Sequence, residues 1–370
     1  MPSFCRHNRF VQNCPICARE QSAELRAIVT PSGPARPGAS SRAGGGGGRG
    51  GGGGQARTPR MQVRRLARGA DDGFRSPLVP GVKSSEDADR LAEELAFAAG
   101  RLRRLEMDPP GCYAEVGAAG AAGAGAAGAA ADLGAGAAGA AGAGAAGTAG
   151  AAGAAGAGTA GAADLEERTW LAFLIAYLCP VNGDDPFAGI RAAHTAWSSG
   201  EEPDLDGVQL GPRTAHDPAR GTKTLDAYRA WAARAGSQAA AFGGEPSWTP
   251  ERRFARAFER LALPGLHRDA RFDLLVTLGR LGVYDLRAGS LHFGGANEMT
   301  IAAKRALGIG DTLLLERRAA ELAEAAALSL EALDLGLHSW GDGTRCMMGL
   351  EPDAEPDPVA LESARAALGL

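Results

Sequence analysis

The sequence is poor in lysine, in aromatic residues and in long apolar runs. Only three of its 39 basic residues are lysine, so arginine is the ordinary cation of this chain. No stretch approaches the roughly 20 apolar residues of a membrane-spanning helix, and the first residues lack the apolar core of a secretory signal. The six cysteines are too scattered for a secreted disulfide scaffold. We therefore expect a cytoplasmic protein with no membrane partner.

Glycine and alanine are abundant instead, and they fill two long tracts. Residues 44–54 are glycine around Arg49, and residues 117–163 are almost wholly alanine and glycine. Neither tract has side chains that bury much apolar surface, and each glycine inside a helix costs about 1 kcal/mol relative to alanine. We interpret both tracts as disordered, and residues 117–163 as a low-complexity loop inserted into a folded domain without a role in its chemistry.

The remaining composition divides the chain into four segments. We expect a zinc-binding knuckle over 1–20, a flexible linker rich in arginine and glycine over 21–60, a helical domain over 61–345 that contains the insert, and a C-terminal tail over 346–370. Residues 1–70 carry twelve arginines against two glutamates, a charge of about +10, whereas the whole chain has −4. Such an arm favours phosphate backbones, although a general bias of this chain towards arginine is the alternative explanation.

Four residues near the start of the chain match a small metal site. Cys5 and His7 are separated by one residue, and Cys14 and Cys17 form a C-x2-C pair. Because so short a segment cannot bury a core, Zn²⁺ bound by thiolates and imidazole would supply its folding energy. The pattern predicts a structural zinc with four protein ligands and no open position for chemistry. A disulfide or free thiols in an unfolded arm are the alternatives.

Apolar residues recur at helical spacing through most of the other segments. Ser84 or Ser85 is suited to cap one helix and Thr249 another, and Asp164 with Glu167 three residues later predicts the start of a central helix. Further helices are expected before Trp197, from Thr224 to Gly236, from Phe272 to Leu281, and over 297–307, 311–327 and 329–339. Only Val283–Tyr284 and Leu291–Phe293 hint at a short hairpin. The predicted fold class is all-α.

A tight glycine corner lies between two of the expected helices. Gly308 and Gly310 enclose one residue, and backbone N–H groups exposed at such a turn, beside a helix N-terminus, suit a phosphate. Lys304, Arg305 and Thr312 flank the corner and can add contacts. This arrangement is the helix–hairpin–helix pattern, which holds DNA by its backbone without reading sequence. A plain corner in which Gly308 only ends a helix is the alternative.

An acidic residue and a histidine occupy an apolar helix downstream of the corner. Asp334 and His338 lie one helical turn apart, and an acid in such surroundings is costly unless it is paired or functional. The pair is therefore a candidate for proton abstraction or for orienting a nucleophile. Alternatively, Asp334 faces solvent or bonds a neighbouring arginine. Arg280 and Arg287 are further candidates for phosphate contact, and Asp285 lies between them.

Several stretches of the chain resemble a known family. The resemblance covers residues 61–116 and 164–341 and rests on Asp72–Pro80, Arg168–Tyr177 with Asp185–Phe187, Phe272–Arg280, and the segment from Gly308 to Trp340. In these stretches the chain is similar to the alpha-glutamyl/putrescinyl thymine pyrophosphorylase family, clade 3, which is related to the helical DNA-glycosylase superfamily. The alanine–glycine insert departs from the compact domain of that family.

The resemblance implies a helical DNA-glycosylase-like domain that acts on DNA. Members of this type displace pyrophosphate from a pyrophosphorylated 5-hydroxymethyl pyrimidine with an amine, which is an amino acid or a polyamine. By analogy, Gly308 and Gly310 would grip the DNA backbone and Arg280, Arg287 or Arg305 would stabilise the departing pyrophosphate. Asp334 or His338 would take a proton from the incoming amine.

Other functions fit the same residues. A base-excision enzyme would use a similar scaffold with an acidic residue after the hairpin. A non-enzymatic, zinc-containing DNA-binding protein would need only the corner, the knuckle and the arginine-rich arm. A helical interaction protein would have no role on DNA, and it would lack the steep salt dependence that phosphate contacts give.

Overall fold

The structure is a computed structural model that describes residues 69–117, 151–295, 297–343, 345–346, 349 and 355–370, with the backbone alone for 151–160. These residues lie within one unit of the chain, Val63–Leu370. The predicted zinc knuckle with Cys5, His7, Cys14 and Cys17, the linker over 21–60 and most of the alanine–glycine insert lie outside the described residues.

The described residues form helices and no strands, which confirms the predicted all-α class. The α-helices are α2 Ser85–Met107, α3 Cys112–Gly117, α5 Ala151–Leu178, α6 Ala188–Ala193, α7 Lys223–Ala235, α8 Gln238–Gly243, α9 Pro250–Arg260, α10 Arg268–Arg280, α11 Glu298–Leu307, α12 Thr312–Ala325, α13 Leu330–Asp342 and α14 Pro358–Leu368, and the 3-10 turns are η2 Trp197–Ser199 and η3 Pro218–Arg220. Within the described ranges, no helix is both long enough and apolar enough to cross a membrane.

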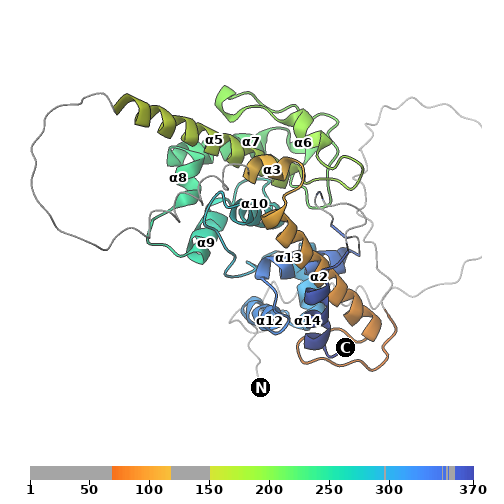
Figure 1. Ribbon diagram of the computed structural model, residues 1–370. Coiled ribbons are helices and arrows are strands. Elements are labelled where there is room, and N and C mark those ends of the chain that lie inside the picture. The colour runs from red at the N-terminus through yellow and green to blue at the C-terminus, as the bar shows by residue number, and fades with distance from the viewer. Residues whose placement is uncertain (1–68, 118–150, 296, 344, 347–348, 350–354) are drawn as a thin grey trace, which may run out of the picture. The chain divides into compact units, whose positions relative to one another are not determined.

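One group of helices packs around α2. Helices α13 and α14 lie against α2, α11 lies against α13, and α12 contacts α11, α13 and α14 (Figure 1). The contact between α13 and α2 is close at Gly336, where an added Cβ would lie 2.9 Å from the Cα of Leu95. A glycine at this position therefore lets the two helix backbones approach each other.

A second group packs around the C-terminal half of α5. Residues Trp170–Leu178 are all buried, as expected for a helix that is apolar on every side. Helices α3, α6, α8 and α10 contact α5, and α10 also contacts α2. Helix α10 therefore links the two groups. Its buried face carries charged residues that are described below.

The predicted start of the central helix was wrong. Helix α5 begins at Ala151, inside the tract that we expected to be a loop up to residue 163. Alanine is the strongest helix former, so a turn seeded by the packed end can continue through alanines despite the glycines. The two acids expected at that start lie within α5, where Asp164 pairs with Arg168 at 3.7 Å and Glu167 accepts from Trp197 N. The neighbouring Glu166 accepts from Gln238 N and Ala239 N at the start of α8.

Most of the other predicted helix starts are confirmed. The side chain of Ser84 caps α2, and that of Thr249 caps α9. The predicted cap at Thr224 was wrong, because the cap position of α7 is two residues earlier, at Thr222. The Thr224 hydroxyl donates to Pro264 O at 3.0 Å, so it joins two segments and caps no helix.

The predicted hairpin does not form. The described residues 283–293 contain no strand. Leu291 N and Phe293 N donate to the Glu316 carboxylate, at 2.9 Å each, and Leu291 O accepts from Arg268. Side chains thus satisfy the backbone groups that a strand partner would have satisfied. The segment expected to be a C-terminal tail carries α14, which is capped by Asp357 and packed on α2.

The close approach of α13 to α2 can be tested with two glycine substitutions. Gly336→Ala should lower the free energy of unfolding by about 1–3 kcal/mol, because the new methyl group collides with α2 backbone. Gly161→Ala in α5 is the matched control, because a Cβ there meets nothing within 4 Å, and it should raise stability by up to about 1 kcal/mol. Urea unfolding followed by circular dichroism measures both. Equal stabilisation by the two substitutions would contradict the close packing of α13 on α2.

Candidate functional site

The glycine corner lies at the surface between α11 and α12. Gly308 ends α11 with φ +65°, a left-handed conformation that favours glycine. Gly308 and Gly310 are exposed, and a Cβ at Gly310 would meet nothing within 4 Å. The amides of Ile309 and Gly310 donate to no other group in the described chain. The corner therefore holds two backbone donors that have no partner among the described residues, one in the half-buried Ile309 and one in the exposed Gly310.

The charge around the corner is mixed. Asp311 caps α12, and its carboxylate accepts from Leu313 N and Leu314 N at 3.0 Å each. This carboxylate occupies the place at the α12 N-terminus that a phosphate would take, and it repels anions. A phosphate at the corner is therefore left with the amides of Ile309 and Gly310.

The residues predicted to flank the corner differ in their surroundings. Lys304 and Thr312 are exposed. The Arg305 guanidinium lies over the indole of Trp340, with its carbon 4.0 Å from the ring centroid. Lys304 is thus the predicted flanking cation whose side chain is exposed to solvent.

Arg280 and Arg287 are not brought to the corner by any contact among the described residues. Arg280 pairs with Glu331 at 3.1 Å and with Glu106 at 3.2 Å. Arg287 is 71% exposed and lies 4.0 Å from a carboxylate oxygen of Glu251 on α9. Arg280 ends α10 and Arg287 lies in the segment after it. Glutamates of other helices lie beside both arginines.

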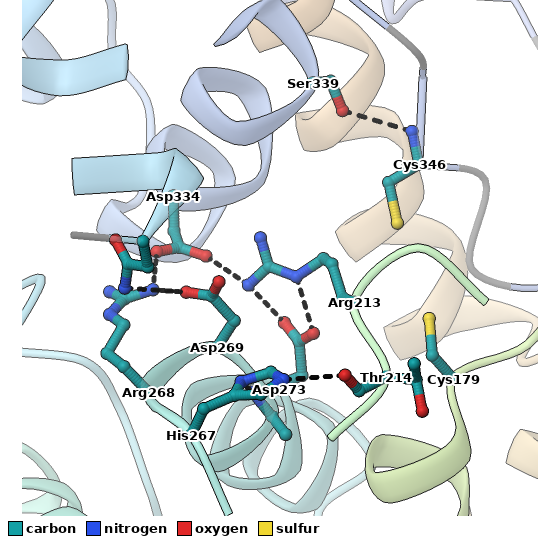
Figure 2. A network of polar contacts seen from close by, with 12 residues as sticks. Cys179, Arg213, Thr214, His267, Arg268, Asp269, Asp273, Asp334, Ser339 and Cys346 are labelled. Carbon is teal, nitrogen blue, oxygen red and sulfur yellow. Dashed lines mark hydrogen bonds and ion pairs between the residues drawn. The ribbon is translucent and has the colours of Figure 1, made fainter. Parts of the chain in front are cut away.

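Asp334 belongs to a buried network of charges. Its side chain is 1% exposed, and its carboxylate is held by Arg213 at 2.8 Å and by Arg268. Figure 2 shows Arg213 between Asp334 and Asp273, with Arg268 on the other side of Asp334. The alternative in which Asp334 bonds an arginine is therefore the one observed, and the arginines are 121 and 66 residues distant in sequence.

The rest of this network surrounds the same two arginines. Arg213 Nε and Nη2 donate to the two oxygens of Asp273 at 2.8 and 3.0 Å, a bidentate pair. Arg268 Nη1 also donates to Asp269 at 3.2 Å. Burial raises the pKa of Asp273. Burial also acts to raise the pKa of Asp269, but Arg213 and Arg268 outweigh it and lower that pKa. Two cations and three acids thus share one buried volume.

His338 is buried beside this network but is not hydrogen-bonded to Asp334. Its side chain is 4% exposed, and its Nδ1 has no hydrogen-bond partner among the described groups. Burial, with the nearby Arg213, lowers the pKa of His338 to about 4, so the imidazole is neutral near pH 7. Asp334 and His338 therefore share a helix face as predicted, but neither has a surface that a DNA strand can touch.

Arg213, Arg268, Asp269 and Asp273 were not identified from the sequence. The three residues of this set in α10 carried a signal, because the charges at 268, 269 and 273 precede the apolar run Leu274–Val276 in the same helix. Arg213 carried none, since it follows a turn-rich stretch without periodicity. Its role depends on a contact between segments that are distant in sequence.

The comparisons with known proteins identify no relative. No protein-family model, no curated protein and no solved structure matches this chain. The similarity to the pyrophosphorylase family therefore stays an expectation that rests on short stretches of similar sequence. Within the described part of the chain, no group of three or more histidine, cysteine or acidic side chains is arranged to hold a metal ion.

The buried, neutral His338 predicts a pH-dependent stability. Its folded pKa of about 4 lies below that of a histidine in the unfolded chain, about 6.5, so the unfolded chain binds the proton first as the pH falls. Stability is present above pH 6.5 and is lost as the pH falls towards 4, by about 2 kcal/mol at pH 5. In His338→Gln, the loss of unfolding free energy between pH 7.5 and 5 should be smaller by about that amount. An unchanged loss in urea titrations would contradict the buried neutral imidazole.

Proposed function

We propose that this protein binds DNA by its phosphate backbone at the glycine corner. The supporting observation is the turn of Gly308, Ile309 and Gly310, in which both glycines are exposed and the N–H groups of Ile309 and Gly310 have no partner in the described chain. Lys304 is exposed on the last turn of α11 beside this turn. Backbone donors with one adjacent cation suit a phosphate, and they carry no information about base sequence.

Exposed leucines beside the corner fit the same surface. Leu313 is 82% exposed and Leu314 54% exposed, both on the first turn of α12. Large apolar side chains that nothing covers often mark a contact surface. In a DNA complex they would lie against sugars or base edges next to the gripped phosphate, and apolar side chains take such positions in the minor groove.

The sequence adds a second contribution to DNA affinity. Residues 1–70, of which only the last two are described, carry an excess of about ten positive charges from arginine. Such an arm would add sequence-independent attraction to phosphates and a steep dependence on salt. Its predicted zinc knuckle would serve as a folded end for the arm, without chemistry of its own.

Binding without catalysis is the function that the geometry supports best. The transferase expected from the family resemblance needs Asp334 or His338 to reach an amine. Both side chains are almost fully buried, and Asp334 is engaged by two arginines. A base held in this way does not contact a substrate at the surface. The DNA-binding alternative requires nothing of either residue except that the fold be stable.

The proposal predicts specific losses of DNA affinity. Gly310→Glu, which places a carboxylate in open space at the corner, should weaken duplex binding about tenfold. Lys304→Gln should weaken binding and reduce the slope of log K against log salt by about 1. Fluorescence anisotropy with two unrelated duplexes at several salt concentrations measures both effects.

The matched control is Gly161→Glu, which adds the same charge at an exposed position where a Cβ meets nothing within 4 Å. It should leave the affinity close to that of the wild type, and the two duplexes should bind the wild type equally. Equal affinities for Gly310→Glu and Gly161→Glu would rule out the corner as the DNA contact.

A further inference from the structure

A second surface site lies between η3 and the start of α10. Residues 214–220 and 263–267 enclose a cavity of about 480 Å³. His216, Asp217 and Arg220 line one wall, and Gly265 and His267 line the other. None of these residues belongs to the glycine corner, and none entered the predicted sites.

The two walls of the cavity are held together by hydrogen bonds. His267 caps α10 with Nδ1, which accepts from Ala270 N, and its Nε2 lies 2.7 Å from Thr214 O on the opposite wall (Figure 2). Because Nδ1 accepts, Nε2 carries the proton and donates. Thr224 donates to Pro264 O and fixes the turn before Gly265. The cavity is therefore preformed.

The buried charge network holds the two chain segments that form the cavity walls. Arg213 directly precedes the first wall, and Arg268 directly follows His267 in the second wall. Both guanidinium groups are anchored on Asp334. The same two chain segments thus line the cavity on their outer side and hold the buried charge network on their inner side.

His216 is a buried side chain in the cavity wall, and it also lines the neighbouring hollow formed with residues 203–210. The residue is only 9% exposed, yet it lines the cavity. Its Nδ1 lies 2.9 Å from the hydroxyl of Tyr177 on α5, and its Nε2 has no partner in the described chain. A buried side chain that lines a cavity, with one nitrogen fixed and the other without a partner in the described chain, can donate to a ligand.

The other groups around the cavity favour an anion. The Arg220 side chain is 53% exposed, and its Nε pairs with Asp217 at 3.2 Å, which leaves both terminal nitrogens for a ligand. His267 lines the cavity and caps the thirteen-residue helix α10, and its amide donates to no group in the described chain. Helix N-termini of this kind attract anions.

Asp217 opposes an anion and so restricts which one can bind. Its carboxylate cancels the charge of Arg220, and a singly charged carboxylate ligand would therefore gain little from charge. A phosphate group carries up to two negative charges and several acceptor oxygens. It can accept from the imidazole, from the guanidinium and from the amide of His267 at once.

We propose that this cavity binds a phosphate group through His216 Nε2, the Arg220 guanidinium and the backbone amide of His267 at the N-terminus of α10. The phosphate belongs either to a free phosphate or monoester, or to a nucleic-acid backbone. Since the residues are separate from the glycine corner, this site does not depend on the DNA contact proposed there.

The experiment uses the full chain with inorganic phosphate as the probe. Nitrogen-15 correlation spectra of the histidine side chains should show saturable shifts of His216 upon addition of phosphate. Arg220→Gln should weaken the apparent affinity about tenfold, the loss of one charge-assisted contact. The matched control is Arg256→Gln on α9, an arginine that is 52% exposed and paired at 3.1 Å with Glu259 in the same i,i+3 manner. It should bind phosphate as the wild type does.

A second titration with a short duplex identifies the source of the phosphate. If DNA shifts the His216 signals and displaces phosphate, the ligand is a backbone phosphate. If only inorganic phosphate or a monoester shifts them, the ligand is a free phosphate group, and both results support the site. No saturable shift in the wild type, or equal affinities for Arg220→Gln and Arg256→Gln, would overturn the proposal. Both arginines are exposed, so neither substitution endangers folding.

Discussion

The buried ion pairs of Arg213 and Arg268 with the Asp334 carboxylate are the interactions on which the described fold depends most. Arg213 comes from the segment before η3, Arg268 from the first residue of α10, and Asp334 from the middle of α13. Moving a carboxylate into a protein interior costs several kcal/mol unless opposite charges and hydrogen bonds offset it. Each arginine makes its own further contacts, with Asp273, Asp269 and Leu291 O. The network therefore fixes three distant segments in one arrangement.

The charged residues of the buried network differ in position from the polar groups proposed to bind phosphate. Asp334, the acid that the sequence places in an apolar helix, lies at the centre of the interior network, where a substrate does not reach. Polar groups that have no partner among the described residues lie at the turn of Ile309 and Gly310 and beside the cavity lined by His216 and Arg220. Both surfaces offer backbone amides at a helix end together with one cation, which is a combination suited to phosphate. The cavity is an open hollow between two chain segments, and the corner is a turn between two helices.

Local signals in the sequence predicted much of the fold. Ser84 and Thr249 cap helices because their hydroxyls bond amides only three residues away, so no tertiary contact is needed. Gly308 ends α11 for a similarly local reason. Glu166 shows the limit of this reasoning, because its carboxylate caps α8, 72 residues further along the chain. The segment around Leu291 failed to pair as a strand because side chains of Glu316 and Arg268 took its backbone groups.

The candidate site was less accessible to prediction than the fold. Sequence alone offered a role for Asp334 as a base or as the partner of an arginine, and only the fold shows which arginines approach it. Arg213 and His216 lie in a turn-rich stretch whose spacing carries no signal. Their importance arises from what the chain brings beside them, namely Asp273 of α10 and Tyr177 of α5. Functional surfaces built from several loops are in general set by such distant contacts.

A double-mutant cycle tests the central role of the buried network most directly. The free energy of unfolding would be measured for Arg213→Gln, Asp334→Asn and the double variant, with Arg256 and Glu259 as the matched pair, since their side chains are 52% and 62% exposed and 3.1 Å apart. We expect a coupling energy above about 1 kcal/mol for the buried pair and about 0.5 kcal/mol or less for the exposed pair. Additive effects at Arg213 and Asp334, within about 0.5 kcal/mol, would contradict the central role of the network.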